Sequence, residues 1–229
     1  MNSLKTKGIV LSRIEYGEAD RIITVLTSDQ GKLSLIAKGV RKLKSKLAGG
    51  VELFSVNEIS FIRGKGEVDT LISARMGENF AHIISDIERV QTGYEILKKI
   101  NKNTEPDVEG EYFNALKSAL AGLDNLSLDP EITRLWFDAQ LLNLAGNTPN
   151  LTQDSAGKKL LADTNYIFDF DSVSFQQNPN GKYSANDIKI LRLFFAAGSP
   201  TILLKIKDLN KYIDLAGQVI KYTANSYLA

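Results

Sequence analysis

The residues best suited to ligand binding form a cationic run in residues 38–50, KGVRKLKSKLAGG. Five positive side chains fall within nine residues, and no acidic residue lies among them. Lysine offers a mobile point charge and arginine a planar fork of N–H donors, and both bind phosphate oxygens. Unpaired charges of this number are too costly to bury, so we expect an exposed basic loop. The five are Lys38, Arg41, Lys42, Lys44 and Lys46.

Two interpretations of this loop are open on composition: a phosphate-binding segment, or a solvated basic loop without a ligand. If each of the five cations neutralised one phosphate of a single strand, log affinity would fall with log salt at a slope of about −3.5. The overall charge of +1 is divided unevenly, because residues 1–77 hold 13 Lys and Arg against 8 Asp and Glu. Residues 78–229 hold 15 against 19. A polyanion is therefore expected at the N-terminal part.

Other reactive side chains show no catalytic or cofactor pattern. His82 is the only histidine and lies among apolar residues, so a structural role is expected. Asp163, Asp169 and Asp171 lack the glycine and the terminal glutamate of a calcium loop. The chain has no cysteine, which excludes disulfides and thiolate-ligated zinc. We therefore expect a protein that is not an enzyme, with no catalytic residue, no metal and no cofactor.

Period-2 alternation and turn residues predict five strands in the first 77 residues. A short Asp29–Gly31 turn between two of them indicates a hairpin. Five short strands with glycine-rich turns favour a small closed barrel, because closure removes exposed sheet edges. The expected strands cover residues 6–14, 21–27, 32–37, 51–62 and 68–74.

After residue 77 the apolar spacing changes to steps of three and four, which is typical of helices. Asp129 followed by Pro130 predicts a capped helix start. The stretch 147–182 is polar and rich in turn residues, so a small β-rich insert is expected there. Expected helices begin near residue 80, near residue 112 and at residue 130, and two more cover residues 186–197 and 209–227.

Further contacts with nucleic acid are expected from the barrel half. The Gly64–Gly66 segment lacks a phosphate-loop pattern, so a hairpin turn is expected, with Arg63 and Lys65 as secondary phosphate contacts. Tyr16, beside a turn glycine, is a candidate for base stacking, and Arg21 is a further cation. Two other aromatic residues of this half, Phe54 and Phe61, are expected in the core.

Several short motifs follow one another in residues 7–74: KGIVL, YGEAD, DQGKL, KGVRK and GKGEV. In this order they resemble the N-terminal domain of the RecO family of bacterial DNA-repair proteins. Lys38, Arg41 and Lys42 match the basic segment that this family uses on DNA. The resemblance implies an α+β protein: a nucleic-acid-binding OB-fold barrel in residues 1–77 and a mainly helical domain in residues 78–229.

The rear half resembles the same family more weakly. The residues around Gly146 and Pro149 look like the lead-in to a zinc-binding insert, in which many relatives carry two Cys-x-x-Cys pairs. Asp154 and Gly157 stand about where the first pair would be, and neither can replace a thiolate ligand. Residues 147–182 are therefore expected to form a degenerate zinc-finger-like insert. We expect it to be held by packing around Tyr166, Phe168, Phe170 and Phe175.

The resemblance implies a recombination mediator that binds single- and double-stranded DNA and anneals complementary strands. Implied partners are RecR, the single-strand-binding protein and, indirectly, RecA. The N-terminus lacks a secretory pattern and no run of 18 apolar residues occurs, so a cytoplasmic protein without a membrane partner is expected. An alternative is a protein-interaction module that touches DNA only incidentally.

Overall fold

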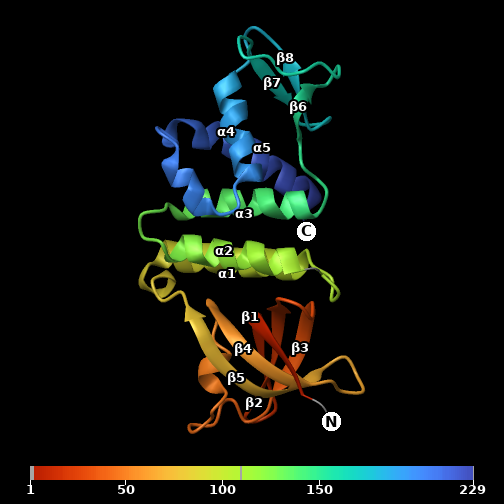
Figure 1. Ribbon diagram of the computed structural model, residues 1–229, viewed down its shortest axis with the longest axis vertical. Coiled ribbons are helices and arrows are strands. Elements are labelled where there is room, and N and C mark those ends of the chain that lie inside the picture. The colour runs from red at the N-terminus through yellow and green to blue at the C-terminus, as the bar shows by residue number, and fades with distance from the viewer. Residues whose placement is uncertain (1–2, 109, 229) are drawn as a thin grey trace. The chain divides into compact units, whose positions relative to one another are not determined.

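The structure is a computed structural model that describes residues 3–108 and 110–228 (Figure 1). Contacts between Cα atoms divide the chain into two compact units, Met1–Leu126 and Ser127–Ala229. The first unit therefore includes two helices in addition to the N-terminal strands. A separate nucleic-acid-binding domain ending at residue 77 stays a prediction.

A closed barrel of five strands forms the first part of unit 1. Its strand order is β1-β2-β3-β5-β4, and all neighbours are antiparallel except β3 and β5. This confirms the expected OB-like barrel within an α+β fold. The strands are β1 (Leu4–Tyr16), β2 (Asp20–Thr27), β3 (Lys32–Ala37), β4 (Ser55–Ile62) and β5 (Asp69–Asn79).

Alternate side chains of these strands fill the barrel. On β2, Ile23 and Val25 are fully buried, and on β3 Leu35 lies beside them in the same cluster. Phe61 is fully buried and Phe54 is 4% exposed, which confirms that both are core residues. Alternation of apolar and polar residues therefore places one face of each strand inside the barrel.

Two helices complete unit 1: α1 (Ile87–Lys102) and α2 (Gly110–Asp124). The expectation that the first helix begins near residue 80 is wrong. Only a short 3-10 turn, η2 (Ile83–Ser85), precedes α1, and Ile84 is 72% exposed. The carboxylate of Asp86 accepts hydrogen bonds from the first backbone N–H groups of α1, so the helix starts at this cap.

Unit 2 contains three helices, α3 (Pro130–Leu144), α4 (Ala185–Ala196) and α5 (Asn210–Tyr227), and a 3-10 segment, η3 (Pro200–Lys205). The side chain of Asp129 accepts a hydrogen bond from the Glu131 N–H at 2.8 Å, which confirms the predicted capped start of α3. Trp136 is buried, and its indole N–H donates to the Ala197 carbonyl.

The insert between α3 and α4 is a three-stranded sheet in the order β6-β8-β7. Its strands are β6 (Asn150–Asp154), β7 (Tyr166–Asp169) and β8 (Ser174–Gln177). The rings of Phe168 and Phe175 meet edge to face at 5.0 Å. Within residues 3–108 and 110–228, no group of three or more His, Asp or Glu residues is placed to hold a metal ion. Aromatic packing therefore occupies the middle of the insert.

Candidate nucleic-acid interface

The basic loop, residues 38–50, is anchored to the barrel at several points. Its backbone N–H at Gly39 donates to the Asp20 carboxylate at 2.7 Å, and the Arg41 N–H donates to the Ala19 carbonyl at 2.9 Å. Val40 is 4% exposed and belongs to the barrel core. The loop therefore lies against the turn that joins β1 to β2.

Two consecutive turns direct the charged side chains of the loop outward. The Lys42 N–H donates to the Gly39 carbonyl at 3.1 Å, and the Ser45 N–H donates to the Lys42 carbonyl at 2.9 Å. Gly39 has a φ of 64°, which favours glycine at this position. Leu43 is fully exposed, unlike Val40. The exposed residues include all five expected cations, Lys38, Arg41, Lys42, Lys44 and Lys46.

Most of this positive charge is not neutralised by the protein itself. Arg41 lies 3.4 Å from the Glu15 carboxylate, and both side chains are partly exposed. The four lysines of the loop form no ion pair with any residue in the described part of the chain. Glu15 belongs to β1, so this ion pair lies within the barrel. The charge stays available to an external polyanion.

Tyr16 and Arg21 flank the β1–β2 turn, against which the basic loop lies. Tyr16 is 54% exposed at the end of β1, opposite Asp20. Arg21 is opposite both Glu15 on β1 and Ala37 on β3, which puts it on the strand end where the loop begins. The fold therefore brings these two residues together with the loop.

Arg63 and Lys65 lie elsewhere, on the turn between β4 and β5. Asp69 is opposite Leu35 in the parallel pairing of β3 with β5, so this turn lies toward the start of β3, whereas the basic loop follows its end. The six residues of β3 span roughly 17 Å, which is the approximate distance along the strand between the β4–β5 turn and the basic loop. Arg63 is also paired with Asp69 at 3.1 Å and lies over the Phe61 ring at 5.2 Å.

A cavity of about 580 Å³ lies under the β4–β5 turn, with Thr24, Ser34, Lys32 and Arg63 among its lining residues. The Lys32 ammonium donates to the carbonyls of Asn101 and Thr104, and burial lowers the pKa of Lys32. Lys32 therefore joins β3 to the end of α1, and two carbonyl oxygens already accept hydrogen bonds from its ammonium.

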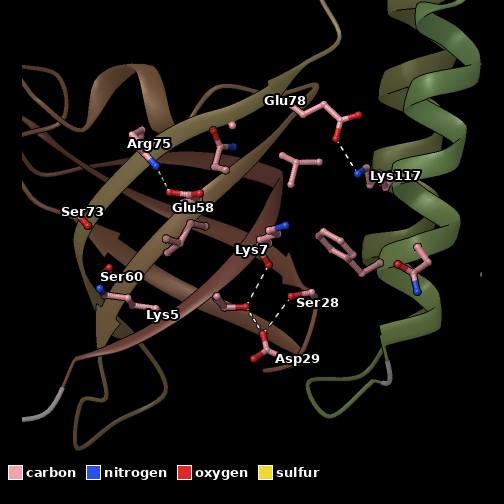
Figure 2. Close-up of a pocket in the computed structure, with 17 residues that line it drawn as sticks. Lys5, Lys7, Ser28, Asp29, Glu58, Ser60, Ser73, Arg75, Glu78 and Lys117 are labelled. Atoms are coloured by element: carbon pink, nitrogen blue, oxygen red, sulfur yellow. Dashed lines mark hydrogen bonds and ion pairs between the residues drawn. The ribbon is translucent and has the colours of Figure 1, made fainter.

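A larger cleft of about 1130 Å³ lies between the outer face of β1, β4 and β5 and helix α2 (Figure 2). Lys5, Lys7, Arg75 and Lys117 line it together with several hydroxyl and carboxylate side chains. These cations are spread over more than a hundred residues of sequence, so no local motif predicts them. Only their strand and helix positions could have indicated a shared surface.

His82, the only histidine, contacts the Asp124 side chain through both its ring and its backbone. His82 Nδ1 lies 3.3 Å from the Asp124 carboxylate, and the His82 backbone N–H donates to the same side chain at 2.7 Å. These contacts join η2 to the end of α2.

Among the described residues, no helix combines the length and apolar character that crossing a bilayer demands.

Closure of five strands in this order, with helices following, defines an OB-like barrel protein with a helical region. Two family models match the chain: "Recombination protein O N terminal" over residues 1–80 and "Recombination protein O C terminal" over residues 95–210. The chain therefore belongs to the recombination protein O (RecO) family.

Individual relatives agree with this assignment. The chain is 35% identical over 168 residues to "DNA repair protein RecO" of Dehalococcoides mccartyi, covering 72% of this chain and 66% of that protein. It is 27% identical over 198 residues to the protein of that name in Halalkalibacterium halodurans, covering 83% of this chain and 77% of the relative. With three Dehalococcoides relatives the match spans only 65–66% of their length.

Proposed function

We propose that this chain acts in DNA repair as a recombination mediator that binds DNA through the basic loop of its barrel. The observation that carries the proposal is the exposed loop charge, in which four lysines lack an ion-pair partner in the described chain. The relatives are named DNA repair proteins. The turns and anchors of the loop present this charge on one side of a compact barrel.

The proposed mechanism is physical and not catalytic. Phosphate backbones of two strands repel one another, and cations that lie between them lower this repulsion. Tyr16 supplies an exposed ring beside the loop, on which an unpaired base could stack. Strands held close together in this way can find their complementary partner. We therefore propose binding of both single- and double-stranded DNA, together with annealing.

The proposed partners follow from the same family. RecR and the single-strand-binding protein are the proposed direct partners. RecA is an indirect partner, which binds the DNA strand after this protein has released it. Unit 2 contains an apolar cavity of about 330 Å³, lined by Leu193, Ile202 and Leu203 together with Lys205. An apolar pocket with a nearby cation suits a tail with apolar and acidic residues, so we propose it for the single-strand-binding protein. A protein that binds chromosomal DNA in bacteria acts in the cytoplasm, so we propose a cytoplasmic location for this chain.

The test is DNA binding and annealing by a variant in which all five loop cations are changed to alanine. The normal protein should bind a labelled single strand with a log–log salt slope near −3.5, or near −2.8 if Arg41 stays with Glu15. The five-alanine variant should lose most of this slope and most of its annealing rate. Undiminished annealing at low salt would contradict the mechanism.

The alternative function, a protein-interaction module, predicts a different titration. Binding to the single strand would then be weak and insensitive to salt in both proteins. Measurement at two salt concentrations separates the two functions, because only phosphate contacts release counterions.

A further inference from the structure

We infer that the cleft between β1, β4, β5 and α2 is a second, separate binding site for a polynucleotide strand. This inference rests on the proposed function, because it names the place where the second strand of an annealing pair is held. The cleft is distinct from the basic loop in its residues and in its position on the barrel.

Strand register builds one row of the cleft from three neighbouring strands. Lys5 on β1 is opposite Ser60 on β4, and Ser60 is opposite Ser73 on β5. The three side chains lie at one edge of the cleft in Figure 2. Neither hydroxyl has a hydrogen-bond partner in residues 3–108 and 110–228. An ammonium beside two free hydroxyls is a suitable set of donors for a phosphate.

The next row continues the same pattern with Lys7. It is opposite Glu58, which is opposite Arg75. Lys5 and Lys7 point to the same side of β1, because side chains alternate along a strand, and they lie about 7 Å apart. This spacing is on the scale of successive phosphates in an extended single strand. It favours a polynucleotide over an isolated anion.

Most acids of the cleft are already neutralised. Arg75 pairs with Glu58 at 2.5 Å, and Lys117 pairs with Glu78 at 2.7 Å. The remaining acid, Asp29, accepts hydrogen bonds from the hydroxyls of Thr6 and Ser28. Figure 2 shows these contacts.

Lys5 and Lys7 are exposed and form no ion pair with any described residue. After the two ion pairs are set aside, Lys5 and Lys7 remain as cations of the cleft, and Asp29 is the one remaining carboxylate among its lining residues. The positive charge that is left lies on β1, in the two rows described above.

The cleft and the basic loop lie toward opposite ends of β1. Lys5 and Lys7 are near the start of this 13-residue strand, whereas Tyr16 is at its end beside the loop. The eleven residue-to-residue steps of β1 from Lys5 to Tyr16 span up to roughly 36 Å. A strand bound at the loop therefore leaves the cleft free for another strand.

The experiment measures capture of a second strand by the full chain. A thymidine oligonucleotide with a donor dye is bound first, and the same sequence with an acceptor dye is added, so that no base pairing occurs. Energy transfer then reports two strands on one protein. The variant Lys5→Ala with Lys7→Ala should reduce second-strand capture at least fivefold and the annealing rate with it. First-strand affinity should stay within twofold.

Two further variants keep the result interpretable. Ser60→Ala with Ser73→Ala tests the same row without changing charge and should also lower second-strand capture. Lys98→Ala with Lys102→Ala removes two exposed lysines of α1 that do not line the cleft, and it should leave capture unchanged. Circular dichroism verifies that each variant is folded.

The possible outcomes separate this inference from the proposed function. If the five-alanine loop variant loses first-strand binding while the Lys5 and Lys7 variant captures the second strand normally, the loop function stands and the cleft site is overturned. Normal capture by the Lys5 and Lys7 variant would also be the result if the cleft holds an acidic peptide. If the loop variant retains both binding and annealing, the proposed function itself is overturned.

Discussion

The Asp20 carboxylate accepts a hydrogen bond from the Gly39 backbone N–H at 2.7 Å. This contact joins the start of β2 to the first turn of the basic loop, in which Gly39 has a positive φ. A hydrogen bond to a charged acceptor contributes about 1.5–3 kcal/mol. The position of the loop cations therefore depends on an acidic side chain at the start of β2.

The first prediction concerns this anchor. Asp20→Ala should speed amide hydrogen exchange at Gly39 and Arg41 and weaken binding of a single strand a few-fold, because the cations lose their fixed placement. Asp20→Asn keeps a side-chain oxygen acceptor and should retain most of the affinity. Equal affinities of the two variants and the normal protein would show that the loop needs no such anchor.

The second prediction concerns the ion pair between Arg41 and Glu15. Glu15→Gln should release Arg41 to phosphate, since these side chains lie 3.4 Å apart and are partly exposed. Affinity for a single strand should rise a few-fold at low salt, and the salt slope should steepen by about 0.7. Glu95→Gln is the matched control, because it removes one exposed negative charge from α1. If Glu95→Gln steepened the salt slope as much as Glu15→Gln does, the change in net charge would explain the effect, and the prediction about Arg41 would be wrong.

The third prediction concerns the three-stranded insert between α3 and α4. Phe175 is fully buried and meets the rings of Phe168 and Tyr183. Phe175→Ala should lower the free energy of unfolding of its unit by about 3–5 kcal/mol, because the change leaves a cavity. Tyr227→Ala, at a half-exposed site, should cost far less. A chelator should not change the melting temperature of the normal protein, and a marked drop would reveal a stabilising metal.

The fourth prediction concerns the buried phenol of Tyr183. Burial, followed by the charge of Asp187, raises the pKa of Tyr183 to about 12. The unfolded chain ionises this phenol near pH 10 while the folded protein must keep it neutral, so the free energy of unfolding should fall between pH 10 and 12. The loss is about 1.4 kcal/mol per pH unit across that window.

Tyr183→Phe tests this dependence by denaturant unfolding at pH 8, 10 and 12. Its hydroxyl has no hydrogen-bond partner among the described residues, so the variant should match the normal protein at pH 8. Above pH 10 it should lose less stability. Tyr227→Phe leaves the buried phenol in place and should follow the normal protein. Parallel losses in the Tyr183 and Tyr227 variants would contradict the assignment.

Sequence patterns alone determined the features that depend on neighbouring residues. The strand at residues 32–37 agrees with β3 residue for residue, and Asp129 caps the start of α3 as its type predicts. The same kind of pattern failed at Ile84, where apolar spacing suggested a helix. There the cap at Asp86 sets the start, because a side-chain acceptor satisfies the first N–H groups.

The crowding of cations in residues 38–50 was also visible in the sequence, because it is a matter of composition within one short segment. Only the tertiary structure decided which of these cations has a partner, since Arg41 meets Glu15 across 26 positions of sequence. It also placed Arg63 and Lys65 away from the loop. Barrel closure aligned Lys5 with Ser60 and Ser73. Register between distant strands depends on the packing of the whole barrel, and no local pattern encodes it.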